Sequence, residues 1–380
     1  MNVAHIPLLL PDMPTADDLM PWLRRIDAAR RYSNFGPLTG ELEVALGAQF
    51  SAANRAPVYV TTVNNATAGL ELALIALDLK PASRVLVPAL TFVATATAVV
   101  RAGHVPVIAD VDPHSWLLTP SLARDAAARM RLAAVMPVAT FGCPHDMQAW
   151  NAFSADTGLP VVIDAAAAYG NQWDCGGATL VFSLHATKSL AAGEGGIVAS
   201  RDARMVARVR QLSNFGISLD ARAITPVGQV EISGTNAKMS EYHAAIGLAN
   251  LARWPAHSAQ RIALYERYQG ALGAVAALRP AWQRTSAAIT RTLLCFRVPV
   301  AGMREAIELA CAQARIDTRR WYLPALNRHD GFTELPVCGP LPVADALSNE
   351  LVGLPFHTRL PTADLRRIVD TVTRAAGPVT

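Results

Sequence analysis

The segment 63–69 (VNNATAG) is the first of three stretches whose residue types could act together in catalysis, and it leads from an apolar run into a helical pattern. Asn65 is a good N-cap. The small residues after it would leave the first amides of the helix open to an anion such as phosphate. An ordinary capped helix after a strand would have the same pattern, so this segment alone leaves both interpretations open.

Asp164 ends the second stretch, the apolar run 160–163 (PVVI), and is followed by four alanines. In open α/β sheets, ligands bind at the carboxyl ends of the strands, where this carboxylate would emerge. A helix cap is the alternative role. The small neighbours favour a ligand site, because they would leave room beside the acid for something flat and bulky.

Lys188 ends the third stretch, 182–188 (FSLHATK), and a glycine turn at 193–196 (GEGG) follows it. It is one of only three lysines, with Lys80 and Lys238, in a chain that otherwise uses arginine. Partial burial would lower the pKa of its amine from about 10.4 and expose the neutral nucleophile that Schiff-base chemistry requires. Arginine stays protonated and could not replace it. A lysine in an exposed loop is the alternative for this stretch alone.

The three stretches together supply the groups that pyridoxal phosphate (PLP) requires. The helix start would bind the phosphate, and the acid would keep the pyridine nitrogen protonated so that the ring accepts electrons. The lysine would form the Schiff base. No G-x-G-x-x-G segment follows an early strand, which argues against an oxidoreductase with a nucleotide cofactor.

An α/β scaffold is expected to position these groups, because short β-branched runs alternate with alanine- and leucine-rich helical stretches between about residues 55 and 200. Most of the runs are apolar throughout, as expected for strands covered by helices on both faces. The predicted strands are 58–63, 85–87, 105–108, 133–138, 161–163, 180–183 and 196–199. The predicted helices are 67–79, 95–102, 122–129, 203–212 and 240–272.

The length of 380 residues suggests about two domains. The pattern becomes more helical after residue 199 and changes again near Pro280. We predict a large domain with an N-terminal arm over residues 1–250 and a smaller C-terminal α+β domain over residues 251–380.

Composition excludes several classes of protein. With 52% hydrophobic and 17% charged residues, the chain is expected to be packed rather than disordered. The net charge of +4 is scattered, which argues against a nucleic-acid partner. Five widely spaced cysteines without a C-x-x-C pair suggest neither a disulfide framework nor a metal site. The N-terminus lacks a basic n-region, and the longest weakly polar run, 85–100, is too short to span a membrane. We therefore expect a soluble, cytoplasmic protein.

The chain resembles the DegT/StrS-type, fold-type I PLP-dependent nucleotide-sugar aminotransferases from about Asn34 to His357. The resemblance is most specific at FSLHATKSLAAGEGG and GTNAKMSEYHAAIG. The segments that carry it are 34–37 (NFGP), 64–74 (NNATAGLELAL), 87–99 (VPALTFVATATAV), 141–147 (FGCPHDM), 161–170 (VVIDAAAAYG), 182–196 and 234–247. It implies a large domain with a mostly parallel seven-stranded sheet between helices.

The resemblance also implies roles for individual residues. Lys188 would form the Schiff base with PLP, and Asp164 would pair with the pyridinium nitrogen. Phe92 would stack on the ring. The phosphate would be bound by the backbone amides of Ala66 and Thr67, by the Thr67 hydroxyl and by the Ser183 hydroxyl.

Asn236 would reach the phosphate of the neighbouring subunit, which implies a homodimer with shared active sites. A cap for the helix that begins near Ser240 is a second role that Asn236 could hold at the same time. Relatives usually carry Gln or His three residues after the aspartate, whereas this chain has Ala167. Contacts to the ring oxygen and the orientation of the substrate are therefore open.

The expected reaction is a ping-pong transfer through pyridoxamine phosphate from an amino acid, L-glutamate by resemblance, to a nucleotide-linked keto-deoxysugar. The resemblance favours a dTDP-4-keto-6-deoxyhexose, with a 3-keto isomer and UDP or GDP carriers as alternatives. Candidate substrate-binding residues are His185, Arg319, Arg320, Tyr322 and His329, and the last four could equally form a solvated turn with core aromatics.

Other functions on the same fold stay open. A lyase or a desulfurase is one, and a desulfurase would need a reactive cysteine, for which Cys143 is the plausible candidate. A non-catalytic regulator would be expected to lose the lysine, which is present. The family's sugar dehydratases have histidine at that position.

Overall fold

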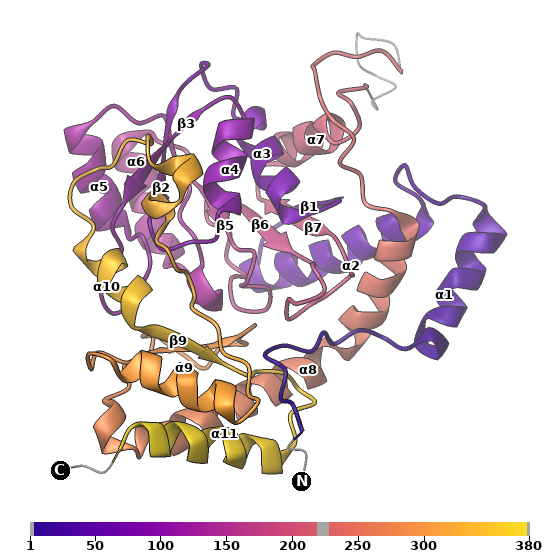
Figure 1. Cartoon of the computed structure of the whole chain (residues 1–380). Coiled ribbons are helices and arrows are strands. Elements are labelled where there is room, and N and C mark those ends of the chain that lie inside the picture. Colours follow the sequence, from indigo (N-terminus) through magenta and orange to yellow (C-terminus); the bar gives the residue numbers. More distant parts are fainter. Residues whose placement is uncertain (1–3, 219–227, 378–380) are drawn as a thin grey trace.

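The computed structural model describes residues 4–218 and 228–377 (Figure 1). Its strands are β1 Tyr59–Val63, β2 Arg84–Pro88, β3 Val105–Ala109, β4 Ala134–Val135, β5 Val162–Asp164, β6 Thr179–Ser183, β7 Gly196–Ser200, β8 Leu294–Arg297 and β9 Leu351–Leu354. Its α-helices are α1 Ala16–Ala29, α2 Pro37–Asn54, α3 Ala66–Ala76, α4 Ala94–Arg101, α5 Pro120–Arg129, α6 Met147–Thr157, α7 Ala203–Leu212, α8 Glu241–Gly273, α9 Met303–Gln313, α10 Pro342–Glu350 and α11 Thr362–Ala375. Short 3₁₀ turns are η1 Thr140–Gly142, η2 Ala276–Leu278, η3 Leu326–Arg328 and η4 Asp330–Phe332.

Strands β1 to β7 form the central sheet. Two ladders, β3-β2-β4 and β5-β6-β7-β1, are joined by isolated parallel bridges from Val135 to Val161 and from Val138 to Asp164. The order is therefore β3-β2-β4-β5-β6-β7-β1. Only β7 runs antiparallel to its neighbours in these ladders. The predicted α/β fold with a mostly parallel sheet is confirmed, and each predicted strand of this sheet is present.

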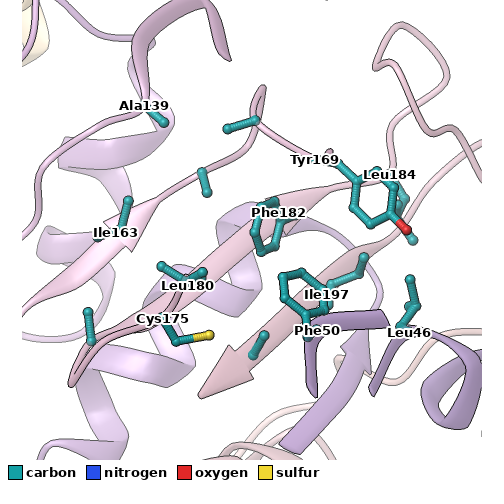
Figure 2. Packing of buried hydrophobic residues seen from close by; sticks show 14 of the residues in the cluster. Leu46, Phe50, Ala139, Ile163, Tyr169, Cys175, Leu180, Phe182, Leu184 and Ile197 are labelled. Atoms are coloured by element: carbon teal, nitrogen blue, oxygen red, sulfur yellow. The ribbon is translucent and has the colours of Figure 1, made fainter. Parts of the chain in front are cut away.

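Both faces of the sheet are buried, as the continuously apolar strands predict. Along β6, Leu180 and Phe182 pack in one core cluster with residues of α2, while Val181 packs in a second cluster with residues of α3. Figure 2 shows the first cluster, with Leu180 and Phe182 of β6 close to Phe50 of α2. The alternation follows from the two-residue period of a strand.

A second, smaller unit forms around the antiparallel pair β8-β9, with α9, α11 and the end of α8 against it (Figure 1). It has its own core cluster, which includes Tyr268, Phe296 and Ile368. Helix α8 runs without a break across the predicted boundary between residues 250 and 251. Leu251 on it belongs to the core of the large unit, and Leu264 belongs to the core of the small unit. The domain boundary stays a prediction.

The N-terminal arm precedes α1 and lies against the small unit. Ile6 forms a parallel bridge with Ile316, and the Leu8 carbonyl accepts a hydrogen bond from the Phe356 amide at 2.9 Å. Asp12 is buried against Arg261 of α8. The arm therefore connects regions that are distant in sequence. None of the described helices is both long and apolar enough to cross a membrane.

Candidate active site

A pocket of about 430 Å³ collects the residues that follow the carboxyl ends of β1, β2, β5 and β6. The three stretches that the sequence singles out, far apart in the chain, all contribute to its lining. Among the predicted site residues, those in the lining are Ala66, Thr67, Phe92, Asp164, Ser183, His185, Lys188, Arg319 and Tyr322. The parallel sheet explains this convergence, since carboxyl ends of parallel strands share one edge.

The start of α3 forms one end of the pocket. The Asn65 side chain caps the helix by accepting a hydrogen bond from the Ala68 amide at 2.8 Å. The amides of Ala66 and Thr67 have no acceptor within the helix, since they belong to its first turn. A Cβ on Gly196 would lie 2.9 Å from the Ala66 nitrogen, so the absence of a side chain at Gly196 lets β7 pack against this helix start. The Ser183 hydroxyl lines the same pocket and accepts from the His185 amide at 3.2 Å.

Asp164 is buried at the end of β5, with only 5% of its surface exposed. The Thr95 hydroxyl donates to one carboxylate oxygen at 2.7 Å, and the Ala166 amide donates to the other at 3.1 Å. Burial raises the pKa of this carboxyl, while these two hydrogen bonds and the charge of Lys188 oppose the rise. The carboxylate thus has neutral donors and a distant cation, and a bound cation would stabilise it further.

Lys188 lies in the turn between β6 and β7 and lines the pocket. Its amide donates to the His185 carbonyl at 2.8 Å, and the Ala186 amide donates to the Gly193 carbonyl at 2.8 Å, so the backbone of the turn is fixed. Burial lowers the pKa of the Lys188 amine, and the charge of Asp164 opposes that change. A lowered pKa increases the fraction of neutral amine, the form that attacks a carbonyl.

Four aromatic residues of the described chain line the pocket: Phe92, Phe141, Trp321 and Tyr322. Phe141 and Tyr322 stack with ring centroids 5.5 Å apart and planes at 16°. Phe92 lies 6.4 Å from Tyr322 and is 55% exposed in the single chain. Burial, with the charge of Asp164 adding to it, raises the pKa of the Tyr322 phenol, so this hydroxyl keeps its proton at neutral pH. The stacked rings of Phe141 and Tyr322 form a flat part of the pocket wall, and the Phe92 ring is tilted by 48° to that of Tyr322.

The pair Arg319 and Arg320 divides between two environments. Arg319 forms a bridge with Gly353 of β9, and in such an extended segment successive side chains point to opposite sides. Arg319 lines the pocket with its guanidinium 4.7 Å from the centre of the Trp321 ring, whereas Arg320 binds Glu308 at 2.7 Å. The structure therefore brings only Arg319 to the pocket.

His329 and Asn236 do not line the pocket of their own chain, as the structure describes it. The His329 ring packs edge-on near Phe332, with centroids 6.4 Å apart. Asn236 is exposed, and its side-chain oxygen accepts a hydrogen bond from Lys238 at 2.8 Å. The predicted role of Asn236 concerns the pocket of a partner subunit and stays a prediction.

His185 lies at the mouth of the pocket beside other polar groups. Its Nδ1 is 2.9 Å from the Thr187 hydroxyl, and its Nε2 is 3.7 Å from a carboxylate oxygen of Glu194. Both side chains of the His185 and Glu194 pair are about half exposed. The two side chains are therefore accessible to solvent.

Several pocket residues are not predicted from the sequence. Thr95 bonds Asp164 and is itself bonded to Thr91 at 2.8 Å. The four-residue spacing of these threonines after a strand is a signal that could have identified them. Leu9 of the N-terminal arm and Phe141 also line the pocket, and only the tertiary fold brings them there. Ala167 lines the pocket as well, so a small side chain stands at that point of the wall.

The sequence profile of the DegT/DnrJ/EryC1/StrS aminotransferase family matches residues 16–373. The chain belongs to this family. Its members use PLP, which is therefore the cofactor of this aminotransferase. The Mycobacterium tuberculosis protein Rv3402c is 30% identical over 98% of this chain and 91% of its own length.

Two solved structures of the family's type are also similar to this aminotransferase. The crystal structure of DesI in the presence of its TDP-sugar product covers 98% of this chain and 93% of its own, with a TM-score of 0.86 and 30% identity. The crystal structure of S. venezuelae DesV in complex with a ketimine intermediate covers 99% of this chain and 100% of its own, with a TM-score of 0.84 and 27% identity.

The residues present fit PLP. Asp164 is a buried carboxylate that accepts hydrogen bonds only from neutral donors, which suits a pyridinium. Lys188 has an amine with a lowered pKa, which suits an aldehyde. The start of α3 has open amides, which suit a phosphate. Cys143 does not supply the reactive thiol of a desulfurase. It is buried outside the described pocket lining, and burial raises its pKa to about 11.

Proposed function

We propose that this aminotransferase moves an amino group from L-glutamate to a nucleotide-linked keto-deoxysugar, a dTDP-4-keto-6-deoxyhexose, in a ping-pong reaction. The observation that carries the proposal is the convergence of Asp164, Lys188 and the start of α3 in one pocket. The likeness to DesI, described with a TDP-sugar product, supports the choice of carrier.

The chain's own residues would hold the cofactor as follows. The amides of Ala66 and Thr67 and the hydroxyls of Thr67 and Ser183 bind the phosphate. Asp164, oriented by Thr95, pairs with the ring nitrogen. When bound, PLP supplies an electron-withdrawing ring that stabilises negative charge on the substrate carbon.

Lys188 has two tasks in this proposal. Its neutral amine would hold the cofactor, and binding of an amino substrate would free that amine. The freed amine then acts as the general base and acid that moves a proton at the substrate carbon, because its lowered pKa brings it nearer to the working pH. Asp164 would stay ionised opposite the protonated ring nitrogen and would take no part in the proton transfer at the substrate carbon.

The rest of the pocket would bind the two substrates in turn. Arg319 is the arginine of the described lining and would bind the donor carboxylate or the diphosphate of the sugar carrier. Phe92 would cover one face of the cofactor ring, and Tyr322 and Phe141 form the wall beside it. His185 would contact the substrate at the mouth. Asn236 of a second copy would complete the phosphate site, so the proposed unit is a homodimer.

An absorbance experiment tests the proposal. The purified PLP-loaded protein should lose its visible absorbance when L-glutamate is added. It should recover that absorbance when a dTDP-4-keto-6-deoxyhexose is then added. UDP- and GDP-linked keto sugars serve as comparisons for the carrier. A loaded protein that is unchanged by L-glutamate and by other amino acids would contradict the proposal.

A further inference from the structure

The turn η1, residues Thr140–Gly142, carries Phe141 into the pocket in an unusual backbone conformation. Phe141 has φ 55° and ψ 22°, in the left-handed region that an aromatic residue seldom adopts. The next residue, Gly142, has φ 85°, and a Cβ there would lie 2.8 Å from the Ala167 carbonyl. Just before the turn, the Ala139 amide donates to the Asp164 carbonyl at 2.9 Å. The turn is therefore packed directly against the chain that carries Asp164.

Side chains from elsewhere hold the first two carbonyls of this turn. Gln283 donates from its side-chain nitrogen to the Thr140 carbonyl at 3.0 Å and to the Ser115 carbonyl at 2.7 Å. Arg291 donates to the Phe141 carbonyl at 3.2 Å and to the side-chain oxygen of Gln283. Both residues lie in the segment that leads into β8.

The third carbonyl is held in the same way. Asn171 donates to the Gly142 carbonyl at 2.8 Å and to the Thr290 carbonyl at 2.9 Å, and its oxygen accepts from the Thr290 amide. Three successive carbonyls thus each receive a hydrogen bond from a side chain. We call Gln283, Arg291 and Asn171 the clamp.

Arg291 is the member of the clamp whose chemistry is hardest to explain by packing alone. It is 3% exposed, and no carboxylate of the described residues lies within 4 Å of its guanidinium. The guanidinium stands 5.0 Å from the centre of the Tyr265 ring. Burying a cation without a counter-charge is unfavourable, and an apolar residue of similar volume is often at least as stabilising. The charged side chain therefore has to be explained by what its hydrogen bonds hold.

We infer that the clamp, with Arg291 at its centre, positions the Phe141 ring as a wall of the substrate pocket. Arg291 is a positioning residue for the transamination reaction. Its bond fixes the left-handed turn, and the turn fixes Phe141 in its stack with Tyr322, 5.5 Å away. A segment of the small unit thereby sets the width of a pocket whose reactive groups belong to the large unit.

The inference concerns the substrate wall of the proposed aminotransferase, and its kinetic test rests on that proposed function. Its structural test does not, because backbone exchange in the turn can be measured without any substrate. The two tests together separate failure of the clamp from failure of the proposed reaction.

The experiment compares Arg291→Met with Arg304→Met in the PLP-loaded full chain. Arg304 is the control, since it is also buried and also donates to a carbonyl, that of Ser348, but it lies outside the described pocket lining. Unlike Arg291, it also pairs with a carboxylate, that of Glu305. Hydrogen–deuterium exchange read by mass spectrometry should show the peptide with residues 139–143 exchanging at least about tenfold faster in Arg291→Met. Arg304→Met should leave that peptide at the wild-type rate.

Kinetics with L-glutamate supply the functional readout. In Arg291→Met the KM should rise about tenfold or more while kcat changes much less, because the wall moves and Lys188 stays in place. Arg304→Met should keep the wild-type KM. Arg291→Lys keeps one donor and the charge, so it should fall between wild type and Arg291→Met in both measurements, and it serves as the test variant if Arg291→Met does not fold.

Each outcome decides between the ideas. Wild-type exchange at residues 139–143 in both Arg291 variants would overturn the clamp. Equal effects of the Arg291 and Arg304 variants would also overturn it, since they would show a general loss of stability. If residues 139–143 exchange fast in Arg291→Met but the wild type does not react with L-glutamate, the clamp stands and the proposed function is contradicted.

Discussion

Two buried regions of this protein each place one carboxylate near one cation, and they do so in opposite ways. In the anchor of the N-terminal arm, Asp12 and Arg261 are in direct contact at 3.1 Å, and Thr358 donates to the same carboxylate at 2.5 Å. In the pocket, Asp164 accepts from Thr95 and Ala166. No ion pair within 4.0 Å joins it to Lys188 among the described residues, so the two charges interact at longer range.

The difference separates a pair that holds the fold together from a pair that is ready to react. A direct ion pair with arginine sets a carboxylate against a group that stays protonated, so the contact holds the arm to α8. Lys188 keeps an amine whose pKa burial has lowered, and Asp164 is a lining residue of the same pocket. The following predictions test this contrast, from the largest expected effect to the smallest.

Replacing Lys188 by alanine should have the largest effect on the reaction. The variant loses the nucleophile and the proton carrier together, so the rate with L-glutamate should fall by about four orders of magnitude or more. Absorbance of the loaded protein after mixing with L-glutamate measures the rate. A variant that keeps wild-type turnover would remove Lys188 from the mechanism.

Asp164→Asn should slow the same reaction by about a hundredfold or more, because a neutral amide no longer stabilises the protonated ring nitrogen. Asn keeps an oxygen that can accept from Thr95, so the local packing is preserved. Asp12→Asn is the matched control in the anchor, and its rate with L-glutamate should stay near that of the wild type. Equal slowing in both variants would contradict the contrast.

Asp12→Ala should act on stability instead. It leaves Arg261 buried without its partner, which costs about 3–5 kcal/mol of the free energy of unfolding. Removing both charges, in Asp12→Ala with Arg261→Met, should recover part of that loss. Urea denaturation of the three proteins measures it. A double variant that is less stable than Asp12→Ala would show that the anchor does not depend on the pairing of the charges.

His357 beside the anchor should give the smallest effect, a pH dependence of stability. Burial lowers its pKa below 6.5, with the charge of Asp12 opposing and that of Arg261 adding to the shift. Below pH 6.5 the unfolded chain binds a proton that the folded chain does not, so stability falls as the pH drops from 6.5 toward the folded pKa. His257, whose pKa burial also lowers, adds to the same trend.

The midpoint of thermal unfolding, followed from pH 7.5 to 5.5, measures this dependence. His357→Gln should flatten the slope, because the variant removes one of the groups that take up a proton on unfolding. A slope that is unchanged in His357→Gln would assign the dependence to other residues.

Much of the scaffold could be predicted from the sequence because its signals are local. Runs such as 180–183 are apolar at every position, which is typical of strands buried on both faces, and β6 is found at Thr179–Ser183. Asn65 before a helical pattern is a local capping signal, and the structure contains that cap. The order of the acid and the lysine along the chain also pointed to the shared edge of the sheet.

The rest of the site depends on contacts between distant segments. Leu9 lines the pocket because the arm crosses to the small unit, and no local pattern specifies that path. The different surroundings of Arg319 and Arg320 follow from the pairing of one extended segment with β9, which the pair of arginines does not encode. The clamp around Phe141 likewise joins three separate stretches of the chain.

Borohydride reduction of the PLP-loaded protein, followed by mass spectrometry of its peptides, tests the central claim most directly. The chain offers only Lys80, Lys188 and Lys238 as lysine amines, so the assignment has few alternatives. We predict that the reduced cofactor is attached to the peptide that contains Lys188. Attachment to either of the other lysines, or to no lysine, would contradict the account.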